Sequence, residues 1–251
     1  MTITRPTFVL VHGAWHSPAH FQSLIEALTD HGYKTVAPYL PSTAQSHISP
    51  STDCTEDATT IRETILTELD SSDVIVVPHS YGGIPTTSAL KGLDTILRTA
   101  AGHKTSVVAI AALTSFIIPA ETDMRQAEQR PPLNPAEMPA TLDPPPVDIF
   151  FHELPDEEKK KWTAMLKPMA SAALVDKCRF SAHEVIPLHY LITGADKAIP
   201  PETQERMLNT LRPKAVGEIR TEIVEGCGHA PFLTRVEETV AFLRRTAGEM
   251  V

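Results

Sequence analysis

The sequence predicts an α/β protein with about six mainly parallel strands in one sheet, helices on both faces, and an inserted cap. Three observations lead to this prediction. Short apolar runs alternate with helical patterns along most of the chain, which is typical of a parallel sheet with right-handed crossovers. A chain of 251 residues fits one such domain with an insertion. A single proline-rich stretch interrupts the alternation.

Six short runs of apolar and β-branched residues predict the strands. The runs are continuous rather than alternating with polar residues, which indicates strands that helices cover on both faces. We expect these strands at 7–11, 34–37, 73–77, 105–113, 187–192 and 218–224.

Helical patterns lie between these runs. The first pattern ends at Gly32, where a left-handed cap is expected. Its apolar residues form one stripe along the helix, and they are Phe21, Leu24, Ile25 and Leu28. We expect the helices at 19–30, 55–69, 84–99, 202–211 and 236–248.

Residues 119–168 contain 10 of the chain's 22 prolines. Because proline lacks a backbone N–H, this stretch cannot supply a central strand. We expect a cap that lies over the C-terminal edge of the sheet and includes a helix at 156–167. The predicted boundaries are 118–185 for the cap, and 1–117 with 186–251 for the core.

A disordered linker is the alternative interpretation of this region. Three aromatic residues argue against it, because their side chains need apolar surroundings. These residues are Phe150, Phe151 and Trp162.

The charge balance argues against nucleic acid as a partner. Lys and Arg number 22 against 31 Asp and Glu, a net charge of −9, so a polyanion would meet mostly repulsion. No apolar stretch approaches the ~18 residues that cross a bilayer, and residues 7–11 resemble a strand rather than part of a signal peptide. We expect a cytoplasmic protein with a small-molecule substrate and no membrane partner, and the sequence leaves a homodimer open.

Three cysteines are too few for a disulfide framework, and they show no paired spacing typical of a metal site. They are Cys54, Cys178 and Cys227. Their number fits a reducing compartment.

Ser80 lies between a predicted strand and a predicted helix. A serine at such a tight junction needs a very small residue two positions later, and Gly82 meets that demand. The common pattern G-x-S-x-G has a glycine where this chain has Pro78, which an extended strand end tolerates. The junction therefore predicts a nucleophilic serine, with a plain helix N-cap as the alternative.

A nucleophilic hydroxyl needs a base and an acid that orients the base. His229 lies in a glycine-flanked loop after the last predicted strand, and Asp196 follows the strand before it. A nucleophile, an orienting acid and a base at three strand ends predict a catalytic triad of Ser80, Asp196 and His229. Other acids could replace Asp196, but they lie in the proline-rich region, and we rank them lower: Asp123, Asp143 and Asp148.

Acyl transfer also requires two backbone N–H donors for the oxyanion. One is expected from Tyr81, the residue after the nucleophile. The other is expected from the loop after the first strand, where Ala14 follows His12 and Gly13.

These motifs resemble those of the α/β-hydrolase fold along nearly the whole chain, and more narrowly the branch of plant methylesterases and hydroxynitrile lyases. The matching stretches are 8–16, 79–83, 196–200 with 204–206, and 228–229. The resemblance implies a doubly wound sheet, a Ser–Asp–His triad, and neither a metal nor an organic cofactor. Hydroxynitrile lyases of this branch carry a threonine where Gly13 stands and a lysine where Ala230 stands, which disfavours lyase activity here. Relatives with an aspartate nucleophile are disfavoured by Ser80.

The sequence therefore predicts a serine hydrolase that cleaves a carboxylic ester or related acyl compound. Candidates for an apolar substrate pocket are Trp15, Tyr81, Phe150, Phe151 and Trp162. Two alternatives stay open. The same triad could open lactones, cleave C–C bonds or perform a non-hydrolytic biosynthetic step, or the pocket could belong to a non-catalytic binding protein.

Overall fold

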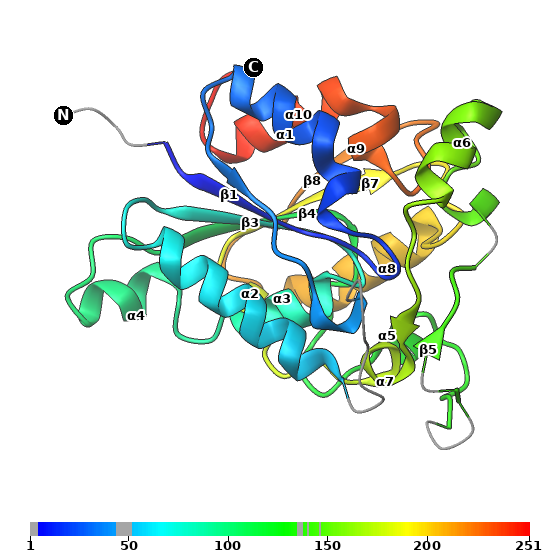
Figure 1. Ribbon diagram of the computed structural model, residues 1–251. Helices are drawn as coiled ribbons and strands as arrows, with labels where there is room; N and C mark the ends of the chain where they lie inside the picture. Colours follow the sequence, from blue (N-terminus) through cyan, green and yellow to red (C-terminus); the bar gives the residue numbers. More distant parts are fainter. Residues whose placement is uncertain (1–4, 44–51, 135–137, 140, 146) are drawn as a thin grey trace.

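A computed structural model shows the arrangement of the chain (Figure 1). The structure describes residues 5–43, 52–134, 138–139, 141–145 and 147–251. Parts of the predicted core and of the predicted cap lie outside the described residues, and these are 1–4, 44–51, 135–137, 140 and 146.

The main sheet has six strands, all parallel, in the order β2-β1-β3-β4-β7-β8. This confirms the predicted fold class. The strands are β1 (Thr7–Val11), β2 (Thr35–Val36), β3 (Val74–Ser80), β4 (Val107–Ser115), β7 (Leu188–Thr193) and β8 (Arg220–Val224). Each lies at a predicted position, and β3 and β4 extend further at their C-terminal ends.

Helices cover both faces of the sheet (Figure 1). One face carries α1 (Gln22–Asp30), α9 (Pro231–Thr234) and α10 (Val236–Thr246). The other carries α2 (Cys54–Glu68), α3 (Gly83–Ala89) and α8 (Pro201–Leu211). In the described parts of the chain, no helix combines the length and the apolar character that crossing a membrane requires.

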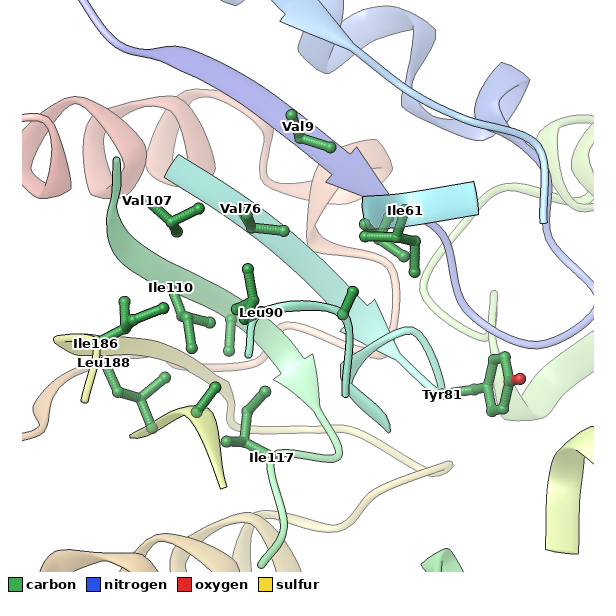
Figure 2. Close-up of a cluster of buried hydrophobic side chains, with 14 of the residues drawn as sticks. Val9, Ile61, Val76, Tyr81, Leu90, Val107, Ile110, Ile117, Ile186 and Leu188 are labelled. Carbon is green, nitrogen blue, oxygen red and sulfur yellow. The ribbon is translucent and has the colours of Figure 1, made fainter. Parts of the chain in front are cut away.

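Successive residues of a strand belong to two separate hydrophobic cores, because their side chains point to opposite faces of the sheet. Phe8 belongs to the cluster under α1 and α10, whereas Val9 joins Val76 and Ile61 in the cluster under α2 (Figure 2). Burial on both faces explains why the strands have continuous apolar sequences.

Two predicted helices differ from the observed ones. The pattern at 19–30 begins as a 3₁₀ turn (Pro18–Phe21) before α1. The pattern at 84–99 splits into α3 and α4 (Thr95–Ala100). The split occurs because the Asp94 side chain accepts a hydrogen bond from Leu97 N–H at 3.0 Å and starts a new helix.

Segment 118–185 forms small elements of its own. They are α5 (Met124–Ala127), β5 (Thr141–Leu142), α6 (Asp156–Thr163), β6 (Met169–Ala170) and α7 (Ser171–Val175), with 3₁₀ turns at Val147–Ile149 and Ala182–Glu184. β5 and β6 form an antiparallel pair. The helix predicted at 156–167 is shorter, since α6 ends at Thr163.

Several contacts attach this segment to the loops after β1 and β8. Trp15 Nε1–H donates to the Leu142 carbonyl at 3.1 Å, and Lys167 N–H donates to the Trp15 carbonyl at 2.8 Å. Gly228 N–H donates to the Glu153 carboxylate. The segment therefore lies against the C-terminal edge of the sheet.

That edge contains the point where the chain reverses direction across the sheet. β1 lies between β2 and β3, so the chain leaves β1 to one side for β2 and returns on the other for β3. Loops that follow β1 and β3 diverge at such a point and leave room for a ligand.

Candidate active site

Ser80 ends β3 in a strained turn. Its φ is +52°, a left-handed conformation that is uncommon for a residue with a side chain. The Ser80 carbonyl accepts hydrogen bonds from Phe116 N–H at 3.0 Å and from Ser115 Oγ at 2.9 Å. Hydrogen bonds from the end of β4 and the residue after it therefore stabilise the strained conformation of Ser80. Strain of this kind is typical of turns at functional sites.

The turn is too tight for a side chain at position 82. A Cβ on Gly82 would lie 2.7 Å from the His12 carbonyl oxygen and 2.9 Å from that of Val11. These are backbone atoms of β1 and its loop, which cannot yield without moving the sheet. Glycine is thus required at this position so that the two backbone segments can approach closely.

Gly82→Ala should lower the melting temperature by about 5 °C, because overpacking of this kind costs a few kcal/mol. Thermal unfolding followed by circular dichroism measures the change. Gly217→Ala is the matched control, because a Cβ there meets nothing within 4 Å and suffers only from the φ of +80°. If the melting temperature fell by the same amount in both variants, contact with β1 would not explain why residue 82 must be glycine.

The structure brings the predicted triad together at three strand ends. His229 Nε2 lies 3.0 Å from Ser80 Oγ, and His229 Nδ1 lies 2.8 Å from Asp196 Oδ2. A carboxylate only accepts hydrogen bonds, so Nδ1–H donates to Asp196 and Nε2 is left to accept from the serine hydroxyl. All three side chains are buried.

Besides His229, four donors hold the Asp196 carboxylate. Thr114 Oγ1 and Thr193 Oγ1 donate to Oδ2 at 2.6 and 3.0 Å, and the N–H groups of Ala198 and Ile199 donate to Oδ1 at 2.7 and 2.9 Å. Burial opposes ionisation, but the electrostatic attraction and the hydrogen bond of His229, together with these donors, lower the pKa of Asp196 to about 2. The group is therefore ionised at neutral pH.

Thr114 is a site residue that sequence analysis missed. It has a φ of +35°, which is exceptional for a β-branched residue, and its hydroxyl is directed at Asp196. No local pattern distinguishes this threonine from others at strand ends. Only the pairing of β4 with β7 reveals its role.

The alternative acids lie elsewhere. Asp123 caps α5 by accepting from Gln126 N–H at 2.9 Å. Asp148 pairs with Lys159 at 3.1 Å, and Asp143 is exposed. Among these acids, only Asp196 contacts His229.

The two expected oxyanion donors line the same cavity as Ser80. Neither Ala14 N–H nor Tyr81 N–H donates to an acceptor within the described ranges. The loop that carries Ala14 is held close, because a Cβ on Gly13 would lie 2.9 Å from Ser80 Cβ. His16 Nδ1–H donates to the Ala14 carbonyl at 2.8 Å and orients the loop.

The Tyr81 side chain contacts a buried acid that the sequence did not reveal. Its hydroxyl donates to Asp57 Oδ2 at 2.7 Å, and Ser42 donates to the same carboxylate through N–H at 2.9 Å and Oγ at 2.6 Å. Burial raises the pKa of Asp57 to about 6 in spite of these hydrogen bonds. Figure 2 shows Tyr81 beyond the end of β3, with its hydroxyl directed away from the core cluster.

Two neutral histidines lie behind the triad. His79 Nε2–H donates to the His229 carbonyl at 2.8 Å and fixes the backbone of that loop. Burial lowers the pKa of His79 and of His16 well below the ordinary value, and neighbouring histidines add to the effect, His229 for His79 and His20 for His16. These side chains support the site by packing and hydrogen bonding.

A cavity of about 330 Å³ opens above Ser80. Trp15 and Phe150 line it, as predicted, but Phe151 and Trp162 do not, and this corrects the predicted pocket. Phe151 is fully buried against His20 on the far side of Phe150. Trp162 also packs on His20, and its Nε1–H donates to Glu158 within α6 at 2.9 Å.

Comparison with known proteins agrees with this architecture. The chain is 29% identical over 260 residues to the "Alpha/beta hydrolase nvfD" of Aspergillus novofumigatus, with 98% of each chain covered. Its structure is similar to a methylesterase, MES16, from Arabidopsis, with a TM-score of 0.72, 18% identity and coverage of 97% of this chain and 99% of the other. It is also similar to tomato methylketone synthase I, with a TM-score of 0.73, 16% identity and 98% of both chains covered.

The model of the alpha/beta hydrolase family matches residues 8–242, which include all three residues of the predicted triad and every strand of the main sheet except the first residue of β1, Thr7. The resemblance inferred from the sequence motifs is thereby confirmed. The chain is an enzyme that belongs to the alpha/beta hydrolase family.

Proposed function

We propose that this enzyme hydrolyses a carboxylic ester of a small molecule through Ser80, His229 and Asp196. The observation that carries the proposal is the unbroken chain of hydrogen bonds from Ser80 Oγ to His229 at 3.0 Å and on to Asp196 at 2.8 Å. The serine end of this series of hydrogen bonds lies at the floor of a cavity with apolar walls. Its order and polarity are those of acyl-transfer enzymes.

In the first half of the reaction, Ser80 Oγ attacks the ester carbonyl carbon while His229 Nε2 takes the hydroxyl proton. The carbonyl oxygen becomes an oxyanion, which the N–H groups of Ala14 and Tyr81 stabilise. The tetrahedral intermediate then collapses, and the leaving alkoxide takes the proton from His229. Asp196 stays ionised and stabilises the imidazolium.

In the second half, His229 removes a proton from a water molecule, which attacks the acyl-enzyme. The new oxyanion uses the same two N–H groups. Its collapse releases the carboxylic acid and returns the proton from His229 to Ser80 Oγ. Segment 118–185 acts as a cap that limits access of bulk water and of large substrates.

A graded series of p-nitrophenyl esters, from acetate to decanoate, tests the proposal. A cavity of about 330 Å³ is at the small end of the range for ligand pockets, so we expect higher kcat/KM for short acyl chains than for decanoate. Release of p-nitrophenol measures turnover. Absence of hydrolysis for all esters, together with no labelling of Ser80 by a fluorophosphonate, would contradict the proposal.

A second candidate is a non-hydrolytic reaction of the same triad. The similarity to an enzyme named methylketone synthase supports it, because such a name denotes formation of a ketone on this fold. Turnover in ¹⁸O-labelled water separates the two candidates. Ester hydrolysis places one labelled oxygen in the acid product, and a non-hydrolytic reaction places none.

A further inference from the structure

The mouth of the substrate cavity carries a positive charge, although the chain as a whole has a net charge of −9. Four charged side chains line the cavity, of which Arg125, Arg130 and Lys197 are cationic and Glu128 is anionic. Their sum is +2, from three positive charges and one negative. A cleft with a net charge and apolar walls concentrates ligands of the opposite sign.

Among the described residues, two of these cations have no ion-pair partner at contact distance, although the positive charge of Arg125 interacts with Glu128. Arg130 Nε lies 3.5 Å from Glu128 Oε2, so that pair is internally compensated. Arg125 Nε–H donates to the Pro131 carbonyl at 3.0 Å, which leaves its terminal nitrogens available. Within the described ranges, neither Arg125 nor Lys197 forms an ion pair with a carboxylate.

Arg125 and Lys197 are more exposed than the nucleophile with which they share the cavity. Ser80 is 8% exposed and forms the floor. Lys197 is exposed, and Arg125 is half-buried on α5, so both belong to the mouth. The remaining lining of the cavity is mainly apolar and includes Trp15, Phe150 and Ile199.

A ligand that spans this cavity has one complementary pattern: a reacting carbonyl at one end, an apolar middle, and an anion at the other end. An arginine fork binds a carboxylate with two parallel hydrogen bonds, and an ammonium adds a second positive charge. In the reverse orientation, the carboxylate would be desolvated close to the Asp196 charge, which is unfavourable. The charge pattern thus also selects the productive orientation.

We propose that the natural substrate is an ester that carries a carboxylate at the end remote from the reacting ester, and that Arg125 and Lys197 bind this carboxylate. The inference rests on the proposed function, because it takes the ester carbonyl to lie at Ser80. It makes these two residues determinants of substrate specificity.

Matched pairs of substrates test the proposal. Mono-p-nitrophenyl esters of the dicarboxylic acids with six to nine carbons carry the carboxylate, and the same esters with the far carboxyl capped as a methyl ester lack the charge. We expect kcat/KM for the best charged ester to exceed that of its capped counterpart by about 10-fold, mainly through KM, as for a charge-assisted hydrogen bond. The ratio should fall as salt is raised.

The double variant Arg125→Gln/Lys197→Gln should bring this ratio close to one. Lys104→Gln is the matched control, because it removes a positive charge from an exposed position that does not line the cavity. It should keep the ratio of the natural protein. A ratio near one in the natural protein, with Ser80-dependent turnover of both esters, would overturn the carboxylate proposal and leave the hydrolase function standing.

Binding separates this proposal from the hydrolase function. Ser80→Ala protein lacks the nucleophile, so calorimetric titration with an uncleaved charged ester reports recognition alone. We expect tighter binding of the charged ester than of the capped one, and loss of the difference when Arg125→Gln and Lys197→Gln are added. Equal binding of both esters would refute the role of these cations, whatever the turnover measurements show.

Discussion

Ser80→Ala should reduce kcat for ester hydrolysis by roughly 10⁴- to 10⁶-fold while the fold is retained. The substitution removes the attacking oxygen, and no other group lies in its place. Among the described residues, the side chain of Ser80 hydrogen-bonds only to His229, and its other hydrogen bonds use the backbone carbonyl, so one hydrogen bond is lost. Initial rates with a p-nitrophenyl ester measure the effect.

Ser71→Ala serves as the control, because Ser71 is an exposed serine in the turn before β3. Both variants should show the far-ultraviolet circular dichroism of the natural protein. Retained turnover in Ser80→Ala would contradict the mechanism, because it would show that another group is the nucleophile. Cys227 is a poor replacement, because burial raises the pKa of its thiol to about 12 and keeps it protonated.

Asp196→Asn should lower kcat by about 10⁴-fold, even though the side chains are nearly the same size. The N–H groups of Ala198 and Ile199 require an oxygen at their end of the side chain. The amide nitrogen of the asparagine would therefore face His229 and donate to Nδ1. That contact places the histidine proton on Nε2, so the base can no longer accept from Ser80.

The rate at saturating ester measures this prediction, because the substitution acts on the chemical step rather than on the cavity. KM should change little. A decrease confined to KM would contradict an orienting role for Asp196, and a large loss of secondary structure would assign it a purely structural one.

The same variant should also change the pH dependence of stability. The pKa of Asp196 in the folded protein is about 2, below the ordinary 3.8. A lowered pKa stabilises the folded state above pH 3.8, and the contribution disappears as the pH falls towards 2. The free energy of unfolding of the natural protein should therefore exceed that of Asp196→Asn by about 2 kcal/mol less at pH 2 than above pH 3.8.

Urea unfolding at several pH values between 5 and 2 measures the narrowing. Asp57 has the opposite effect, since burial raises its pKa to about 6, so its stabilising contribution is lost as the pH rises through 6. It is present in both proteins and cancels from the difference. Asp70→Asn removes a carboxylate at an exposed turn and serves as the control for loss of one negative charge.

The sequence alone determined the class of fold and the residues most central to the site. Burial on both sheet faces leaves continuous apolar strands, so β1 could be predicted at its observed bounds. The tight turn at Ser80 demands a glycine at 82, and a local steric demand of this kind is visible in a motif. Asp196 and His229 could be paired with Ser80 because parallel strands end at one edge of the sheet.

Only the tertiary structure decided which other side chains reach that edge. Thr114 and Asp57 contact site residues 82 and 24 positions away in the chain, and no periodicity or spacing records such contacts. Phe151 and Trp162 were correctly expected to need apolar surroundings, but they are buried against His20 rather than in the cavity. The physical reason is common to all four: hydrophobic and hydrogen-bonding preferences of a residue are local, whereas its partner depends on how distant segments pack.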